Sequence, residues 1–358
     1  MTNYRNQSEK RVMQAINFGI PDRIPRMDSY WDEFAAACKK QLQLPADINL
    51  KDHFQIDITI AYPQEAPFFK SARLIESDGE YETHRNEWGC LIRNKPGTYF
   101  EEELGSDVLS EKRFLDDLEF DAPDDSRRYQ GFMDLIARER PKRCIFGKIG
   151  GPFIRSSFVR GKTQFLMDIA EDPEFAKALI EKMGMHLLEI AKQELRRGDL
   201  FDTGIWIYDD MAFNQGPLIS PKSFERILLP VYSKMVAELK KCGAAKVCFH
   251  SDGNIEPLLD MLVDAGIDAI NPLEPRAGMD IEKLMNKYGK KLAYIGGMCN
   301  SVVLPNGPKE KIRDQVARII QLGRNGGVII GAHSIGPDIP VEHYLAYVDY
   351  VTELGQYQ

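Results

Sequence analysis

The strongest constraint on the fold is an alternation of short β-rich runs with longer helical stretches, which begins at residue 144. In the stretches between the runs, apolar residues recur every three or four positions, as in amphipathic helices, and glycines close several of these helices. The six runs are CIFGKIG (144–150), TGIWIYDD (203–210), KVCFHSDG (246–253), DAINPLEP (268–275), KLAYIGGM (291–298) and GVIIGAHS (327–334). Two earlier runs, RIPRMDS (23–29) and IDITIAYP (56–63), bring the number of βα units to eight.

Eight such units favour a (β/α)8 TIM barrel, in which parallel strands close on themselves, over a doubly wound open sheet with the same local pattern. Residues 72–97 differ, because they alternate around an Asp78-Gly79 turn and predict a β-hairpin inserted after the second strand. The chain has no Pro/Ser-rich linker, so we expect residues 1–358 to form a single domain.

The composition excludes several classes of protein. A chain with 43% hydrophobic residues can bury a sizeable core, so it is not disordered. The net charge of −8 and the absence of a long Lys/Arg block argue against nucleic acid as a partner. Apolar runs stay shorter than the roughly 18 residues of a membrane span, so no membrane association is expected. Six scattered cysteines and the lack of an apolar N-terminal segment predict a reduced, cytoplasmic protein.

Polar residues gather at the ends of the predicted strands. In βα barrels, the chemistry lies at the carboxyl ends of the strands, so residues that are distant in sequence converge there. The candidates are Asp28, Asp57, Tyr62, Gln64, Lys148, Asp209, Asp210, His250, Asp252, Glu274 and His333.

Four of these residues, His250, Asp252, Glu274 and His333, are candidate metal ligands. Imidazole and carboxylate together form a nitrogen and oxygen shell suited to Zn²⁺, Fe²⁺ or Mn²⁺. On an extended strand, alternate residues share a face, so the H-x-D pair can direct both side chains to one ion. The alternative is that this short spacing is incidental.

The other candidates would act on the substrate. Asp57, Asp209 and Asp210 are candidate catalytic residues, and only one of the two adjacent aspartates can face the pocket; the alternative for Asp209 and Asp210 is capping of a loop, and for Asp57 solvation of a loop. Arg155 can bind an anionic substrate or be an ordinary exposed charge. Together with Arg155, the candidate substrate-binding residues are Asp28, Tyr62, Gln64 and Gln215.

Three stretches carry a resemblance to a known family: YDDMAFNQGPLISPKSFERILLP (208–230), FHSDGNIEPLLDMLVDAGIDAINPLEP (249–275) and GAHSIGPDIPVEHY (331–344). They resemble the uroporphyrinogen decarboxylase-like superfamily, which includes decarboxylases, corrinoid-linked methyltransferases and, more distantly, cobalamin-independent methionine synthase. The resemblance covers most of the chain and implies a (β/α)8 barrel.

The methyltransferase branch of this family has a zinc site of the form H-x-C, then Glu, then Cys. His250 matches the His, Asp252 replaces the first Cys, Glu274 matches the Glu, and His333 falls at or next to the last Cys. The resemblance therefore implies a divalent metal, with zinc expected first, in a harder donor set than thiolates. It also implies methyl transfer between a corrinoid, on a separate carrier protein, and a small-molecule acceptor, by an enzyme that forms a homodimer.

Two alternatives remain open. Decarboxylation of a tetrapyrrole would use Asp57 in the place of the family aspartate that contacts the pyrrole nitrogens. In PRMDSYWDEF (25–34), however, Arg26 and Asp28 stand where decarboxylases carry paired arginines. The other alternative is a non-catalytic barrel that binds a corrinoid or tetrapyrrole.

Overall fold

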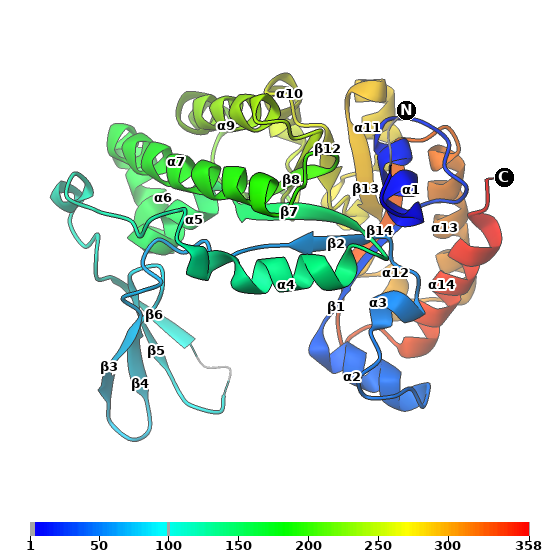
Figure 1. Ribbon diagram of the computed structural model, residues 1–358, viewed down its shortest axis with the longest axis horizontal. Coiled ribbons are helices and arrows are strands. Elements are labelled where there is room, and N and C mark those ends of the chain that lie inside the picture. The colour runs from blue at the N-terminus through cyan, green and yellow to red at the C-terminus, as the bar shows by residue number, and fades with distance from the viewer. Residues whose placement is uncertain (1–3, 99–100, 358) are drawn as a thin grey trace.

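An eight-stranded parallel sheet forms the centre of the molecule in a computed structural model, which describes residues 4–98 and 101–357 (Figure 1). The strand order is β1-β14-β13-β12-β11-β8-β7-β2. A backbone hydrogen bond of 3.0 Å from Asp57 N to Arg26 O links the two ends of this order. The predicted (β/α)8 barrel is thus confirmed. Its strands are β1 (Arg26–Tyr30), β2 (Ile58–Ala61), β7 (Cys144–Gly150), β8 (Gly204–Tyr208), β11 (Lys246–His250), β12 (Ala269–Asn271), β13 (Ala293–Gly297) and β14 (Val328–Ile335).

Helices surround the sheet and join successive strands (Figure 1). None of the described helices is long and apolar enough to cross a membrane. The longer ones are α2 (Asp32–Gln41), α4 (Gln130–Glu139), α5 (Pro152–Arg160), α6 (Lys162–Glu171), α7 (Pro173–Arg197), α9 (Leu229–Lys241), α11 (Ile281–Tyr288), α13 (Lys309–Gly323) and α14 (Val341–Leu354). Shorter helices are α3 (Leu50–His53), α8 (Pro221–Ser223), α10 (Leu259–Asp264) and α12 (Val303–Asn306).

Helix α1 (Gln7–Ile16) closes the amino end of the barrel. Its apolar side chains, including Val12 and Ile16, join one buried cluster with interior residues such as Phe146 and Trp206. Gly327 N, just before β14, donates a 2.7 Å hydrogen bond to Ala15 O. The opposite, carboxyl end of the barrel is therefore the end at which a site can form.

The period of two along each strand decides what reaches that end. On β7, Cys144 and Phe146 lie in the buried interior cluster, so Lys148 continues the same face toward the mouth. The same alternation carries Cys248 on β11 to His250 and Ala269 on β12 to Asn271. The uppermost inward layer of the barrel is thus polar, whereas the layers beneath it are apolar.

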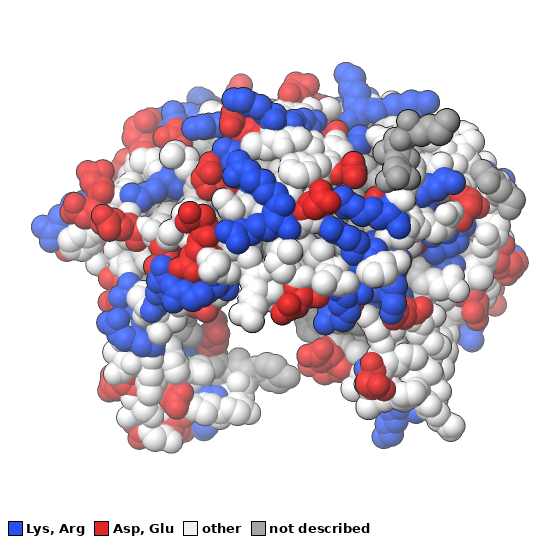
Figure 2. Space-filling view, viewed as in Figure 1, with Lys and Arg blue, Asp and Glu red and all other residues white. Residues whose placement is uncertain are grey.

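The inserted segment is larger than the predicted hairpin over 72–97. Strands β3 (Arg73–Ser77) and β4 (Glu82–Arg85) pair antiparallel around the Asp78 turn, but β5 (Cys90–Asn94) and β6 (Glu101–Ser106) extend them into a four-stranded sheet. This sheet projects from the barrel at the lower left of Figure 1. Figure 2 shows a hollow between this lobe and the lobe that contains α2.

Candidate metal centre

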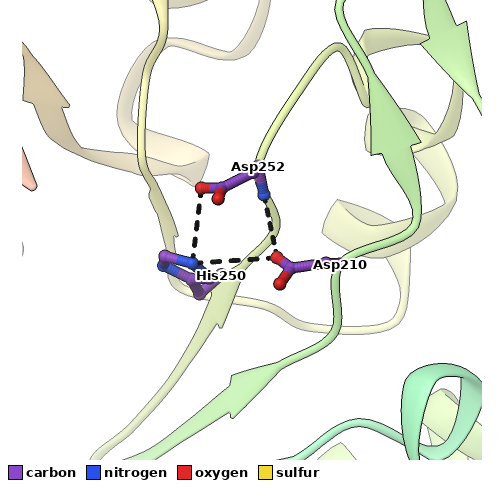
Figure 3. Close-up of side chains that lie close together, drawn as sticks. All are labelled: Asp210, His250 and Asp252. Carbon is purple, nitrogen blue, oxygen red and sulfur yellow. Dashed lines mark hydrogen bonds and ion pairs between the residues drawn. The ribbon is translucent and has the colours of Figure 1, made fainter. Parts of the chain in front are cut away.

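A cluster of His250, Asp210 and Asp252 lies at the carboxyl ends of β8 and β11 (Figure 3). His250 ends β11, Asp252 follows it in the loop, and Asp210 lies two residues beyond β8. The Nε2 atom of His250 is 3.8 Å from Asp210 Oδ1 and 3.6 Å from Asp252 Oδ1. His333, on β14, brings its Nε2 atom to 3.3 Å from the same Asp252 oxygen. Residues from three strands thus direct ligand atoms to one place.

These separations fit a shared cation. In a tetrahedral site with bonds of about 2.0–2.1 Å, neighbouring ligand atoms lie about 3.3 Å apart. Asp252 Oδ1 is buried and, among the described residues, accepts no hydrogen bond of good geometry, although His333 is near. A buried carboxylate oxygen without a donor is costly unless a cation satisfies it. Two imidazoles and two carboxylates are donors that Zn²⁺, Fe²⁺ and Mn²⁺ all accept.

Asn271 prepares His250 as a nitrogen ligand. The Asn271 amide donates from Nδ2 to Ile295 O at 3.1 Å, which turns its Oδ1 atom toward His250 Nδ1 at 2.6 Å. An oxygen at that position requires the proton to be on Nδ1, so the lone pair of Nε2 faces the two aspartates. Burial lowers the pKa of His250, against the charges of Asp252 and Asp210, and favours the neutral ring.

Tyr208 fixes the orientation of the same ring from β8. Its ring stacks on His250 with centroids 4.0 Å apart and planes 12° apart. The two residues are direct partners in the β8–β11 register, so the contact follows from the pairing of the strands. With Asn271 on one nitrogen and Tyr208 on one face, the imidazole has little freedom to turn away from the cluster.

His333 reaches the cluster through an unusual backbone conformation. Its φ of +48° lies in the left-handed region, which costs a residue with a Cβ about 1 kcal/mol or more. Burial alone would lower the pKa of His333, but the nearby Asp252 carboxylate, together with Glu274, raises it. His333 therefore lies beside Asp252, and its predicted role as a metal ligand stays a prediction.

Glu274 supports the loop that carries Asp252. Its Oε2 atom accepts a hydrogen bond of 2.7 Å from Gly253 N, while Asp252 N donates to Asp210 Oδ1 at 3.1 Å. Gly253 has φ +80°, and a Cβ there would lie 2.8 Å from Ala212 backbone atoms, so the turn requires glycine. Glu274 therefore lies beside the cluster with one oxygen already engaged, and its predicted role as a ligand stays a prediction.

The two adjacent aspartates after β8 have separate environments, as the alternation predicted. Asp209 is fully buried and accepts hydrogen bonds from Phe153 N at 3.0 Å, Ile154 N at 2.7 Å and the Tyr232 hydroxyl. It thereby holds the first turn of α5, and burial raises its pKa to about 7. The structure does not bring Asp209 to the cluster, and these contacts fit the capping alternative; its predicted catalytic role stays a prediction, whereas Asp210 faces His250.

Asp57 lies at the wrong end of the barrel for the role predicted from the sequence. It precedes β2 and pairs with Arg11 at 2.6 Å and Arg23 at 2.8 Å, beside helix α1. Ser8 Oγ and Arg26 N donate two more hydrogen bonds to its carboxylate. The prediction that Asp57 lies at the mouth is therefore wrong: this buried carboxylate joins α1 to the amino ends of β1 and β2.

Asp28 lies nearer the mouth, where it lines a cavity of about 220 Å³, and its carboxylate is held by hydrogen bonds. Its oxygens accept hydrogen bonds from Ala332 N at 2.7 Å and from the Tyr344 hydroxyl of α14 at 3.2 Å. Burial raises the pKa of Asp28 to about 6. Asp28 therefore links β1, β14 and α14, and its carboxylate does not lie in the metal cluster.

A cavity of about 800 Å³ lies beside the mouth, on the side of β2 and β7. Three predicted substrate-binding residues line it, namely Tyr62, Gln64 and Arg155. Gln64 donates to Glu87 Oε2 at 2.7 Å, and Arg155 pairs with Glu65. Gln215 does not line this cavity, because it is exposed in the turn between β9 (Ala212–Phe213) and β10 (Gly216–Pro217).

Two residues of the site were not assigned a role from the sequence. Lys148 lines the large cavity, and Asn271 orients His250. Both are polar residues at inward positions near the ends of apolar strands, and this pattern was the available signal. Asn271 escaped notice because an uncharged amide after a strand is common in turns.

A closed parallel barrel with polar side chains converging at its carboxyl end is the architecture of barrel enzymes. The chain belongs to the uroporphyrinogen decarboxylase (URO-D) family, whose model matches residues 99–354, so the predicted superfamily is confirmed and the family is one of enzymes.

Individual relatives are distant. Uroporphyrinogen decarboxylase from Geobacter sulfurreducens is 24% identical over 285 residues, which cover 75% of this chain and 76% of the relative. The protein of the same name from Geotalea daltonii is 25% identical over the same shares. Among solved structures, a methyltransferase from Methanosarcina mazei matches with a TM-score of 0.66 and 16% identity, covering 97% of this chain and 98% of the other. This last likeness concerns the fold.

Proposed function

We propose that this protein is a metal-dependent methyltransferase of the URO-D family, which moves a methyl group between a corrinoid and a small acceptor. The observation that carries the proposal is the cluster of His250, Asp210, Asp252 and His333, with a buried Asp252 oxygen that accepts no hydrogen bond of good geometry among the described residues. The barrel shares its fold with the methyltransferase from Methanosarcina mazei. The corrinoid, its carrier protein and a homodimer are parts of the proposal that rest on the family resemblance.

Four side chains would hold the metal: His250, His333, Asp210 and Asp252, with Glu274 as the predicted further ligand. A bound divalent cation supplies Lewis acidity to an oxygen or sulfur atom of the small substrate. Zinc is the ion expected first, and the replacement of thiolates by carboxylates leaves Fe²⁺ and Mn²⁺ as alternatives.

The chain's own groups prepare this site. Asn271 holds the proton on His250 Nδ1, so that Nε2 presents a lone pair without a preceding deprotonation. Glu274 and Asp210 accept hydrogen bonds from Gly253 N and Asp252 N, which fixes the loop that carries the Asp252 carboxylate. A preformed set of donors loses little conformational entropy when it binds a ligand.

Decarboxylation of a tetrapyrrole is the competing function, because curated relatives carry that name. That reaction was predicted to use Asp57 at the mouth, but Asp57 is ion-paired to Arg11 and Arg23 at the amino end. Turnover of uroporphyrinogen that persists in the presence of a chelator would favour the decarboxylase over the methyltransferase.

The direct test is methyl transfer from methylcobalamin, followed by its visible absorbance, with a panel of thiol and hydroxyl acceptors. We expect turnover by the wild type, loss of turnover after chelation, and recovery when a divalent ion is returned. His250→Ala should abolish turnover, whereas His53→Ala, which removes an exposed histidine of α3, should not. Equal turnover by His250→Ala and wild type would contradict the proposal, and ligand binding without turnover would indicate a non-catalytic barrel.

A further inference from the structure

Lys148 occupies a position between two hollows of the protein. It lines the cavity of about 800 Å³ beside the mouth and also a smaller cavity of about 220 Å³ inside the barrel. Among the described residues, Tyr62 is the only other one that lines both. The ammonium group of Lys148 lies 4.9 Å from the ring centroid of Tyr62 and 4.9 Å from that of Tyr208. Lys148 thus contacts two aromatic rings at the place where the large cavity adjoins the barrel interior.

The charge of Lys148 is not neutralised by a carboxylate. Among the described residues, its ammonium group makes no ion pair or hydrogen bond, whereas the other cations that line the large cavity are engaged. Arg155 pairs with Glu65, Arg127 with Asp125 and Arg138 with Glu139. Arg128 donates to four backbone carbonyl oxygens. Lys148 is therefore the cation of this cavity wall that is available to a ligand.

The acidic groups near Lys148 are committed elsewhere. Glu65 also accepts a hydrogen bond from Gly150 N, in addition to its pair with Arg155. Glu194 is fully buried, and burial raises its pKa well above the usual range. Asp210 lies in the metal cluster. Burial lowers the pKa of Lys148, which is the effect of a cation held without a counter-ion.

The position of Tyr208 relates Lys148 to the metal cluster. Strand β8 lies between β7 and β11 in the sheet, so the inward side chain of Tyr208 lies between those of Lys148 and His250. One contact of Tyr208 is the stacked ring of His250, and another is the Lys148 ammonium group. A ligand that binds at Lys148 therefore extends past Tyr208 to reach His250.

We infer that Lys148 binds a carboxylate of the substrate, so that the small molecule of the proposed reaction is an organic acid with an apolar or aromatic body. One lysine matches one negative charge, whereas phosphate sites commonly use several donors or a planar arginine fork. The aromatic residues Tyr62, Trp88 and Phe132 line the same cavity and suit the apolar body. The reaction in this inference rests on the proposed function, but the binding of the acid does not.

The test measures binding of benzoate and 3-phenylpropionate by calorimetry, with benzamide as the neutral counterpart of benzoate. We expect wild type to bind at least one acid more tightly than benzamide, and Lys148→Met to weaken that acid about 10- to 100-fold, as for a hydrogen bond to a charged group. Lys148→Arg should restore part of the affinity. Lys311→Met, which removes an exposed lysine of α13 that lines neither cavity, should leave the affinity unchanged.

Several results would overturn the inference. These are binding of neither acid by the wild type, unchanged affinity in a folded Lys148→Met variant, and tighter binding of inorganic phosphate than of either acid. The variant His250→Ala separates this inference from the proposed function, because it removes a proposed metal ligand and keeps Lys148. If no protein variant transfers a methyl group but the acid still binds in a Lys148-dependent way, the proposed function fails and the carboxylate site stands.

Discussion

Replacement of Asn271 by alanine should weaken metal binding without removing a ligand. The change deletes the acceptor 2.6 Å from His250 Nδ1 and the donor to Ile295 O, and both partners are buried. His250 can then adopt the other tautomer or rotate its ring, so Nε2 no longer presents a fixed lone pair. Loss of such a supporting hydrogen bond costs about 10- to 100-fold in metal affinity, or about 1.4–2.8 kcal/mol.

The assay for Asn271→Ala is competition for Zn²⁺ against a chromophoric chelator, with Asn306→Ala as the control. Asn306, the last residue of helix α12, makes a comparable amide hydrogen bond to Val302 O at 2.8 Å, but this bond is exposed. Two unpaired buried groups should also lower the free energy of unfolding by about 1–3 kcal/mol each, measured with urea in the absence of metal. A zinc affinity within twofold of the wild type, in a folded Asn271→Ala protein, would refute the assignment of Asn271 as the residue that orients His250.

Three further predictions concern stability. Asp57→Asn leaves Arg11 and Arg23 without their buried partner, so urea should show a loss of about 3–5 kcal/mol with unchanged metal content per folded chain; metal loss would instead link Asp57 to the site. For Asp209, a pKa of about 7 lies above the unfolded value of about 4. Its contribution to stability is therefore complete below pH of about 4 and is lost as pH rises through about 7. Asp209→Asn should remove that part of the pH dependence, and an identical profile for both proteins would contradict the buried environment. Finally, a chelator should lower the melting temperature of the wild type but not of His250→Ala, because an ion that binds only the folded state stabilises it; equal shifts would place the ion elsewhere.

The barrel could be predicted from the sequence because the apolar strand runs end in polar residues and are followed by stretches with the apolar period of a helix. His250 and Asp252 were found for a related reason: the period of two fixes that they share a face, and the end of β11 coincides with the end of the apolar run. The same period established that Asp209 and Asp210 diverge. It could not say which one faces inward, because that depends on Phe153, Ile154 and Tyr232, which are distant in sequence.

Other residues were misplaced or missed for physical reasons. Asp57 stands at the start of the run IDITIAYP, and β2 begins one residue later, so its charge lies at the amino end. The insert was underestimated because β6 begins with three glutamates and is largely exposed, which hides the alternation of a half-buried strand. Lys148 was visible as a polar strand residue, but only the arrangement of Tyr62, Tyr208 and Glu65 shows that it is held without a counter-ion.

The most direct test of the metal centre is elemental analysis of wild type and His250→Ala, both purified without added metal or chelator. The cluster of His250, Asp210, Asp252 and His333 predicts about one divalent ion per wild-type chain and its loss in the variant. A wild-type protein that holds no metal, even after reconstitution with Zn²⁺, Fe²⁺ or Mn²⁺, would contradict it.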